Sequence, residues 1–558
     1  MTPCTALTLT LTLGLFLHAH GDVTEPLDLV VKTALGSLKG DFVSVKGKET
    51  GAHAFLGVPF AKPPLGPALR LAPPQPVESW EGVRDATQQP PMCIQVKALT
   101  EDLYAKIGLK VKVQDISEDC LYLNIYTPAT RAPDAKLPVM FWIHGGSFVM
   151  GAASSYDGSA MAAYEDVVVV QIQYRLGLLG LFSTGEKDMA GNYGLLDQVE
   201  ALKWVQKHIH NFGGNPDLVT IYGESAGGMS VSFLLLSPMT NGLFHHAIAQ
   251  SGTAAIFELL HVDPMTSAQM AANMSGCNIE STESISDCMR NLDVQKMVEL
   301  AEIQELRFTI TVDGQFLTKP VNDLYRNHEV QKVPFMTGIT SDEGGWLFLS
   351  FMAPPNWTEG MTREEVMGVL SIFYPIEPKY VALNLIIDEY SGKSEDPITL
   401  RKTVAEVLGD LIFTIPGVTT INAHTDVGAP VYVYEYNFTP QSIRNLRPDF
   451  VGSDHGDDLF SVFGFCFTTQ DVTMLECSKE EEDLSLRIMK IWANFARTGS
   501  PNGDGLVHWP QYGPEENYMF IDMQQEVRQG LRKDRFVFLT ETLPKTLQEL
   551  AKKNHVEL

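Results

Sequence analysis

The stretch Ile221-Tyr222-Gly223-Glu224-Ser225-Ala226-Gly227-Gly228 decides the fold. Strand-forming residues lead into it, and a long apolar run at 231–236 follows the small residues after Ser225. The pattern predicts the end of a strand, a sharp turn and the start of a helix. Gly223-x-Ser225-x-Gly227 fits a turn that strains the Ser backbone and needs neighbours almost without side chains. The Ser hydroxyl would then sit at a helix N-terminus, where the dipole favours negative charge.

The five-residue pattern alone is equally compatible with an ordinary Gly-rich turn, so the rest of the chain has to decide between the two interpretations.

The chain has 558 residues, of which 44% are hydrophobic and 20% charged, and this composition supports a large globular core. The net charge is −27, with no basic cluster, which argues against nucleic acid as a partner. Neither C-x-x-C nor H-E-x-x-H occurs, so we predict no metal and no cofactor. The acidic run at 480–483 is expected to be a solvated helix face.

Both ends of the chain carry targeting signals. The apolar run at 7–17 and the small residues at 19–21 predict a signal peptide over residues 1–21, although no Lys or Arg precedes the run. No other segment reaches about 18 uninterrupted apolar residues, so we expect no membrane span. The tail His555-Val556-Glu557-Leu558 resembles the K-D-E-L/H-D-E-L retrieval signal. Together they predict the lumen of the endoplasmic reticulum, with a retrieval receptor as partner, or secretion if the tail is not read.

The cysteines and glycosylation sequons agree with entry into the secretory pathway. Removing Cys4 with the signal peptide leaves six cysteines, an even number that suits an oxidising compartment. Pairing of sequence neighbours is the simplest connectivity, while for the last two cysteines a pair of free thiols is the alternative. The six cysteines are Cys93, Cys120, Cys277, Cys288, Cys466 and Cys477, and the three sequons begin at Asn273, Asn356 and Asn437.

Buried strands alternate with helices along the middle of the chain. This alternation predicts an α/β fold, with a large, mostly parallel central sheet and helices on both faces. We expect residues 22–558 to form one domain, in which the segments 255–330 and 345–425 are mainly helical insertions that roof the site. Strands are expected at 138–143, 167–172, 244–250, 333–339 and 431–438, a helix at 192–210, and an edge hairpin from 30–38 and 41–45.

Three further motifs supply what an activated Ser needs. His144-Gly145-Gly146-Ser147 directly follows a predicted strand, and such a turn could aim backbone N–H groups at the Ser as an oxyanion hole. A tight structural turn is the alternative. His455 lies in a loop of Gly and small polar residues, C-terminal to the Ser, as the order Ser, acid, His of the α/β-hydrolases requires. Asp342 and Glu343 follow another predicted strand, and their spacing leaves open which acid orients the imidazole.

Several long stretches together make the chain resemble the type-B carboxylesterases, the cholinesterase-like α/β-hydrolase group. The resemblance covers nearly the whole mature chain and is greatest to the vertebrate liver- and intestine-type enzymes. These stretches are Phe55-Leu56-Gly57-Val58-Pro59-Phe60-Ala61-Lys62-Pro63-Pro64, Ser117-Glu118-Asp119-Cys120-Leu121-Tyr122-Leu123-Asn124, Trp142-Ile143-His144-Gly145-Gly146, Phe212-Gly213-Gly214-Asn215-Pro216-Asp217, Gly223-Glu224-Ser225-Ala226-Gly227-Gly228, Asp454-His455-Gly456-Asp457 and Trp492-Ala493-Asn494-Phe495-Ala496.

The resemblance implies a serine carboxylesterase that hydrolyses small-molecule carboxylic esters, with some thioesters and amides, through an acyl-enzyme. Its substrates would be xenobiotic or lipid-derived. It implies a triad of Ser225, Glu343 and His455, and so favours Glu343 over Asp342. It further implies oxyanion donors at Gly146, Ser147 and Ala226, disulfides Cys93–Cys120 and Cys277–Cys288, and an ion pair between Arg175 and Asp197. The family often has Gly where this chain has Ser147, so a Cβ is expected to crowd the substrate pocket there.

Three other functions fit the fold. A non-catalytic, neuroligin-like adhesion protein is expected to lose triad residues and to carry a membrane span. A cholinesterase needs an aromatic-lined gorge for a quaternary ammonium, for which core packing explains the available aromatic residues as well. A bile-salt lipase is expected to carry a repetitive Pro-rich tail, which is absent here.

Overall fold

A large twisted sheet forms the centre of the computed structural model, which describes residues 29–256, 263–303, 306–374, 377–470, 472–473 and 477–556. The predicted signal peptide and the last two residues of the retrieval-like tail lie outside these ranges. The sheet has eleven strands in the order β18-β17-β15-β14-β13-β12-β10-β11-β9-β4-β3. The pairs from β11 across to β17 are parallel, and antiparallel pairs complete both edges. The predicted α/β class and mostly parallel sheet are therefore confirmed.

The central strands from β10 to β15 are buried along most of their length, and β10 and β11 are almost wholly apolar, as expected for strands buried on both faces. Along β10, alternate side chains enter two separate hydrophobic cores: Val139, Phe141 and Ile143 one, Met140 and Trp142 the other. The strands of the sheet are β3 (Asp41–Val45), β4 (Lys48–Pro59), β9 (Tyr122–Pro128), β10 (Leu137–Ile143), β11 (Val168–Ile172), β12 (Gly214–Glu224), β13 (His246–Gln250), β14 (Phe335–Thr340), β15 (Val431–Tyr436), β17 (Asn517–Ile521) and β18 (Glu526–Gln529).

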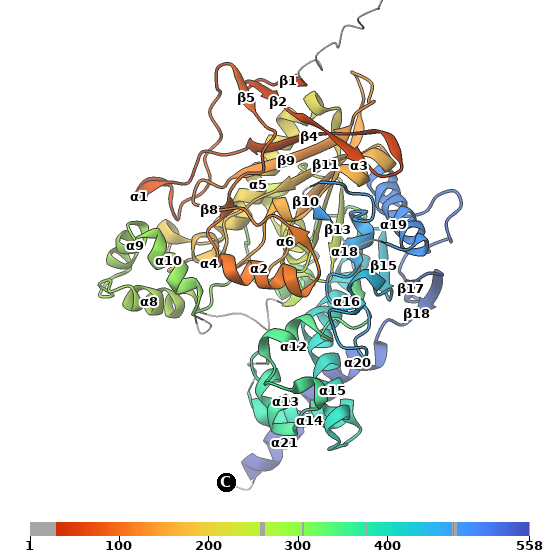
Figure 1. Cartoon of the computed structure of the whole chain (residues 1–558). Helices are drawn as coiled ribbons and strands as arrows, with labels where there is room; N and C mark the ends of the chain where they lie inside the picture. Colours follow the sequence, from red (N-terminus) through yellow and green to blue (C-terminus); the bar gives the residue numbers. More distant parts are fainter. Residues whose placement is uncertain are drawn as a thin grey trace, which may run out of the picture.

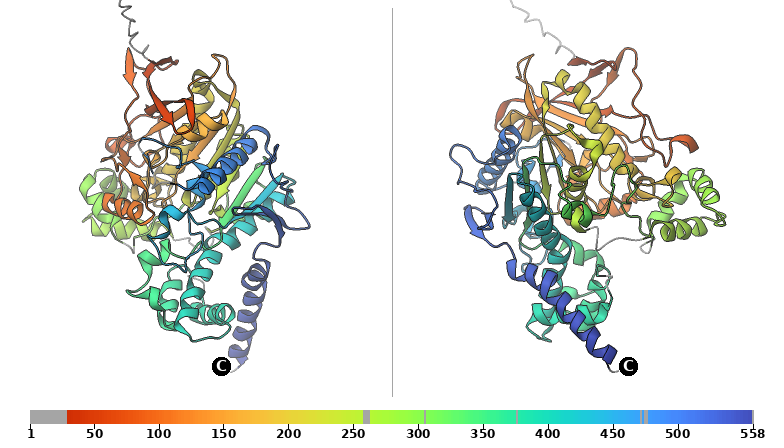
Figure 2. Two further views of the ribbon diagram at one scale, coloured as in Figure 1. Left: turned by 45° about the vertical axis from the view of Figure 1, so that its right-hand side comes forward. Right: turned by 180° about the vertical axis from the view of Figure 1, so that it is seen from behind.

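Helices cover both faces of this sheet, as Figures 1 and 2 show. One face carries α5 (Tyr193–His208), α6 (Ala226–Leu236) and α16 (Ile415–Asp426), which share a core with β12, β13 and β14. The other face carries α3 (Ser159–Glu165) and α19 (Lys479–Thr498). Each face thus has its own core, and the carboxyl ends of β10, β12 and β14 remain available for a site.

The two predicted insertions are helical, but they lie in different places. In Figure 1, α8 (Pro264–Met274), α9 (Thr282–Arg290) and α10 (Val294–Ala301) gather at the left, where α10 contacts α4 (Gly177–Leu181). The second insertion lies below the sheet with α21 (Leu543–Val556), which contacts α14. Among the described residues, the second insertion places the aromatic rings of Phe348 and Phe413 on the predicted site residue His455. Its helices are α12 (Leu347–Met352), α13 (Arg363–Leu370), α14 (Lys379–Ser391) and α15 (Pro397–Gly409), followed by a π-helical turn (Asp410–Thr414) and α16.

The predicted N-terminal hairpin is wrong in one respect. β1 (Val30–Lys32) pairs with β2 (Ser37–Lys39), but these two strands form a separate three-stranded sheet with β5 (Val83–Asp85). β3 instead joins the edge of the large sheet through β4. A Cβ on Gly40, between β2 and β3, would lie 2.6 Å from Ala54 O and 2.7 Å from the Phe55 ring, so this close approach requires glycine. The chain passes from the small sheet to the large one at Gly40.

The acidic run at the start of α19 is only partly a solvated face. Glu481 is buried, and its carboxylate accepts hydrogen bonds from the backbone N–H groups of Ser478 and Gln441. It is the third residue of a capping box, in which the Ser478 hydroxyl accepts from Glu481 N–H. Glu480 and Asp483 are exposed, as predicted.

One helical stretch of the described residues is long and apolar enough to span a membrane. It runs over Pro397–Asp426, and 83% of its most apolar window is buried inside the protein. Its side chains pack into the core beside α6, β14 and β15. By burial it is a core helix, although no apolar run of that length is evident in the sequence.

The remaining elements connect or flank these layers. They are α1 (Gly66–Leu69), β6 (Met92–Cys93), α2 (Lys97–Lys106), β7 (Lys110–Val111), β8 (Ile116–Ser117), α11 (Val321–Arg326), α17 (Gln441–Arg444), α18 (Asp458–Val462), β16 (Val472–Thr473) and α20 (Lys533–Val537), with short 3₁₀ turns at Ala153–Ser155, Lys187–Met189, Ile209–Phe212, Pro238–Thr240, Ala254–Ile256 and Trp357–Glu359 and a π-turn at Phe538–Thr542.

Candidate active site

Ser225 occupies the sharp turn between β12 and α6. Its backbone has φ 57° and ψ −123°, a conformation that L-residues rarely adopt. The neighbouring glycines allow the turn, because a Cβ on Gly227 would lie 2.0 Å from Ile143 O and one on Gly223 2.5 Å from Gly227. Ser225 N–H donates to Gln250 O of β13, and Ser225 O accepts from Met229 N–H. The turn is therefore fixed between two strands, with Ala226 as the first residue of the helix.

The loop after β10 lies directly against this turn. A Cβ on Gly145 would lie 3.0 Å from the Cβ of Ser225 and 2.7 Å from Glu224 Oε2. The loop backbone is left-handed at Gly146 (φ 104°) and at Ser147 (φ 55°). Within the described part of the chain, the N–H groups of these two residues meet no hydrogen-bond acceptor. Ala226 N–H, at the first position of α6, has no carbonyl of its own helix to bond.

His144 holds the start of this loop. The ring is buried, stacks on Tyr174 with 4.4 Å between ring centroids, and its Nδ1 lies 2.8 Å from Gly145 O. Burial lowers the pKa of His144 to about 4, so the ring is neutral and Nδ1–H donates to that carbonyl. Tyr174 Oη in turn donates to His144 O. His144 is thus a structural residue of the loop.

His455 is brought to Glu343 from far along the chain. The distance from His455 Nδ1 to Glu343 Oε2 is 2.6 Å, and Glu343 Oε1 accepts from Thr340 N–H at the end of β14. Both side chains are buried. Asp342 faces elsewhere, because its Oδ2 accepts from Gly452 N–H. The structure therefore separates the two acids that spacing left open, and it is Glu343 that contacts the imidazole.

The other ring nitrogen of His455 lies beside Glu224, the residue before Ser225. Nε2 lies 3.0 Å from Glu224 Oε1, but the direction does not make a hydrogen bond, and no other described group bonds this nitrogen. The Ser225 hydroxyl likewise has no hydrogen-bond partner among the residues that the structure describes. Glu224 connects the nucleophile turn to the histidine. It directly precedes Ser225, its Oε2 would lie 2.7 Å from a Cβ on Gly145, and its Oε1 lies 3.0 Å from His455 Nε2.

The charges around His455 decide its protonation. Burial alone would lower its pKa, but the carboxylates of Glu224 and Glu343 outweigh burial and raise the pKa well above 6.5. The ring stacks on Phe413 at 4.5 Å and contacts Phe348 at 5.2 Å, and these two phenyl rings of the second insertion contact each other at 5.6 Å. Aromatic packing and two carboxylates therefore fix the ring and favour its cation.

Several of these contacts had no separate signal in the sequence. Glu224 was visible only as the acidic residue inside the Ser motif, Phe348 only as one of the aromatic residues that could line a pocket, and Phe413 was not singled out. Gln250 also went unnoticed, although its backbone accepts from Ser225 N–H and its Nε2 donates to Asp458 Oδ2, three residues after His455. Contacts of this kind depend on which strands lie side by side.

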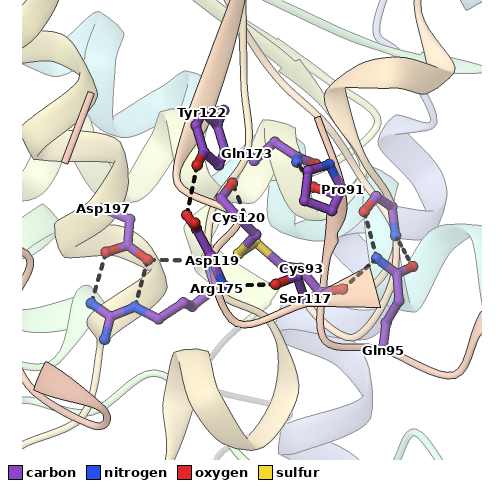
Figure 3. The surroundings of a disulfide bond; sticks show 11 residues. Pro91, Cys93, Gln95, Ser117, Asp119, Cys120, Tyr122, Gln173, Arg175 and Asp197 are labelled. Carbon is purple, nitrogen blue, oxygen red and sulfur yellow. Dashed lines mark hydrogen bonds and ion pairs between the residues drawn. A yellow bond between two sulfur atoms is a disulfide. The ribbon is translucent and has the colours of Figure 1, made fainter. Parts of the chain in front are cut away.

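Disulfides join Cys93 to Cys120, Cys277 to Cys288 and Cys466 to Cys477. Three disulfides fit an oxidising compartment. The free-thiol alternative for the third pair is thereby overturned. Near the first, Arg175 makes a buried pair of hydrogen bonds to Asp197, 2.8 Å from Nε and 2.7 Å from Nη2 (Figure 3).

The three sequon asparagines differ in accessibility. Asn273, near the end of α8, and Asn356 are exposed. Asn437 is half-buried, and its Nδ2, the atom that would carry a glycan, donates to Asp522 Oδ2 at 2.8 Å. No cluster of potential metal ligands occurs among the described residues.

Comparison with known proteins identifies the family. A sequence model of the Carboxylesterase family matches residues 27–539. The pyrethroid hydrolase Ces2e of Rattus norvegicus is 44% identical over 552 residues, covering 98% of this chain and 95% of the relative. The cocaine esterase of Homo sapiens is 42% identical, covering 98% and 97%. The medium-chain fatty acyl-CoA hydrolase precursor of Anas platyrhynchos is 42% identical, covering 99% of each. The chain belongs to the carboxylesterase family and is a carboxylic ester hydrolase.

Proposed function

We propose that this esterase works through an acyl-enzyme on Ser225, with His455 as base and Glu343 as the acid that orients it. The observation that carries the proposal is the buried 2.6 Å contact between His455 Nδ1 and Glu343 Oε2, which leaves Nε2 without a hydrogen bond beside Glu224, the residue before Ser225. Glu343 holds the imidazole and stabilises the cation that forms when Nε2 accepts the Ser225 proton.

Backbone N–H groups stabilise the intermediate in this proposal. Gly146, Ser147 and Ala226 supply the donors, because the first two meet no acceptor in the described chain and the third begins a helix. Each such donor is worth about 3–4 kcal/mol of transition-state stabilisation. The alcohol leaves with the proton of His455, and water deprotonated by the same residue then releases the acid. This route uses only groups of the chain itself.

We propose xenobiotic or lipid-derived carboxylic esters as substrates, with thioesters and amides as further ones. The names of relatives point this way, because those proteins are described as hydrolases of pyrethroids, cocaine, acylcarnitine and fatty acyl-CoA. The aromatic rings of Phe348 and Phe413 beside His455 favour apolar substrate groups. The exposed side chain of Ser147 would limit the size of the group next to the oxyanion.

We keep a single catalytic domain over residues 22–558, a signal peptide over 1–21 and retention in the endoplasmic reticulum lumen as predictions. The supporting observations are the three disulfides, the retrieval-like tail, and the exposed Asn273 and Asn356 as glycan acceptors. Asn437 would have to release Asp522 to be glycosylated after folding, so we expect it to be the least occupied.

The test is turnover of an ester panel by the purified protein and by Ser225→Ala. The panel pairs short-acyl, large-alcohol esters with large-acyl, small-alcohol esters and includes a choline ester. We expect turnover by the wild type and a loss of about 10⁶-fold in kcat in the variant, with unchanged thermal unfolding. Equal turnover by both proteins would overturn the role of Ser225, and no turnover of any ester would favour an adhesion-type role.

A further inference from the structure

The loop that carries the candidate oxyanion donors is held in an unusual backbone conformation. Its residues Gly146, Ser147, Phe148 and Gly151 all have positive φ, at 104°, 55°, 60° and 112°. Ser147 and Phe148 are not glycines, and such residues stay left-handed only where their surroundings hold them there. Contacts with other parts of the chain therefore have to supply that restraint.

Backbone hydrogen bonds restrain the first part of the loop. The N–H groups of Val149 and Met150 donate to Gly146 O, and Gly177 N–H donates to Phe148 O. At the far end, Gly151 is fixed by a side chain from another part of the chain. That side chain is Gln95, which is 1% exposed.

Gln95 binds both polar atoms of the Gly151 backbone. Its Nε2 donates to Gly151 O and its Oε1 accepts from Gly151 N–H, each at 2.9 Å (Figure 3). Nε2 also donates to Cys93 O at 3.1 Å, and Oε1 accepts from Thr100 Oγ1 at 2.7 Å. The amide thus uses two N–H donors and two acceptor sites, its whole capacity. Because all of its donors and acceptors are used, the Gln95 amide is held in one orientation.

The backbone near Gln95 is anchored by a disulfide bond. Cys93, two residues earlier, is joined to Cys120, two residues before β9 begins at Tyr122. Thr100 lies on α2, and Tyr104 of the same helix is hydrogen-bonded to Ser155, just beyond the loop. The segment from Cys93 to Tyr104 therefore bonds the loop at Gly151 and the chain just beyond it at Ser155, and among the described residues Gln95 makes no hydrogen bond to Ser225, Glu343 or His455.

We propose that Gln95 is a positioning residue for the oxyanion loop, which it holds through Gly151 from the Cys93–Cys120 segment. This inference rests on the proposed role of Gly146 and Ser147 as donors. Gln95 touches no reacting atom, so its loss acts by letting the loop shift. A displacement of about 1 Å at such a site costs on the order of 100-fold in rate. The effect should fall on transition-state stabilisation rather than on substrate binding.

The experiment compares Gln95→Met with a matched control. Methionine has a similar length but cannot bond the peptide. The control is Gln331→Met, since the Gln331 amide also donates to backbone carbonyls, of Leu234 and Ser237, but touches no residue of the loop. Measured quantities are kcat, KM, the concentration of active Ser by titration, the thermal midpoint, and the Ki of a trifluoromethyl ketone, which forms a tetrahedral adduct.

We expect Gln95→Met to lower kcat per active Ser by about 10- to 100-fold, with KM within about twofold and the ketone Ki raised in parallel. Gln331→Met should change the thermal midpoint but leave kcat and Ki within about twofold. Thr100→Val removes only one bond to Gln95 and should give a smaller loss of the same kind, so it serves if Gln95→Met does not fold.

Two results would overturn the inference. One is an unchanged Ki and kcat per active Ser in both Gln95→Met and Thr100→Val. The other is an equal loss in the Gln331→Met control, which would indicate general destabilisation. Failure of the proposed function is recognised separately, because wild-type turnover would then not depend on Ser225.

Discussion

At the Ser225 turn, a Cβ on Gly223 or Gly227 would lie 2.5 or 2.0 Å from backbone atoms, whereas around His455 the short contacts join ionisable side chains. The nucleophile side is shaped by steric exclusion between main-chain segments. The histidine side is shaped by charges removed from water. The nucleophile side requires particular residue types at fixed positions. The histidine side requires a balance of charge among several ionisable groups.

The histidine side buries an unusual number of acids. Burial raises the pKa of Asp454 to about 8, of Asp457 to about 6 and of Asp458 to about 7. Arg447 offsets part of this, since it lies 2.7 Å from Asp457 and 3.8 Å from Asp454. Substitutions that add bulk on the nucleophile side should therefore impair folding. Substitutions that change charge on the histidine side should alter the rate and its pH dependence.

The largest expected effect on stability is on the steric side, for Gly227→Ala. A methyl group 2.0 Å from Ile143 O forces α6 away from β10, and overpacking of this kind costs about 1–3 kcal/mol or more. We expect soluble yield and ester turnover to fall together, measured by denaturant unfolding and active-Ser titration. Gly368→Ala is the control, because nothing lies within 4 Å of its added Cβ in α13, and it should stabilise by about 0.5–1 kcal/mol. Equal stability of the two variants would contradict steric control of the turn.

On the histidine side, Glu343→Gln should keep the fold and lower kcat by about 10⁴-fold, because an amide no longer stabilises the cation or its orientation. Asp342→Asn is the matched control, since Asp342 bonds Gly452 N–H and not the imidazole. We expect the control to lose less than about tenfold. The measurement is kcat on one activated ester for each protein. A larger loss in Asp342→Asn than in Glu343→Gln would reassign the orienting acid.

The pH profile tests the balance of charges. His455 must be neutral to accept a proton, and its pKa is raised well above 6.5 by Glu224 and Glu343 against the effect of burial. Glu224→Gln removes one anion, so the imidazolium is less favoured, the pKa falls and the acid limb of kcat/KM moves to lower pH. Glu481→Gln, at a buried acid that caps α19, should leave the limb in place. A limb that moves to higher pH, or not at all, would refute the influence of Glu224.

The smallest expected effect concerns the junction of the two sides, at Ser147. Ser147→Gly removes the Cβ beside the proposed oxyanion position and should raise the ratio of kcat/KM for bulky over small alcohol groups by about twofold to tenfold. Stability should change little, because relief of left-handed strain, about 1 kcal/mol, is offset by greater freedom of the unfolded chain. Ser147→Ala keeps the Cβ and should keep the ratio. If Ser147→Ala shifts the ratio equally, the hydroxyl and not the Cβ decides it.

Local pattern was sufficient to predict most of the central sheet. The apolar runs at β10, β11 and β14 need no long-range information to be identified as buried strands, and the Ser225 turn is encoded by its own glycines. Prediction was incomplete at the edges. The strands β17 and β18 were not anticipated, because β17 has only five residues and all four residues of β18 are exposed. The helix α21 was not anticipated either.

The site divides in the same way. Residue types and order pointed to Ser225, His455 and the loop after His144, and family resemblance selected Glu343. The third disulfide was only one of two alternatives in the sequence, and the structure joins Cys466 to Cys477. The roles of Gln95 and Glu224 needed coordinates, since each acts through groups distant in sequence: Gln95 through Gly151, and Glu224 through His455.

By itself, the sequence determined the α/β sheet, the strained turn at Ser225 and the kind of chemistry, because these depend on glycines, apolar runs and motifs that act over a few residues. Only the tertiary structure decided which acid meets His455, how its ring is charged and what holds the oxyanion loop. Those outcomes depend on burial and on distances between segments more than a hundred residues apart in some cases, and electrostatic energies in a buried site change steeply with such distances.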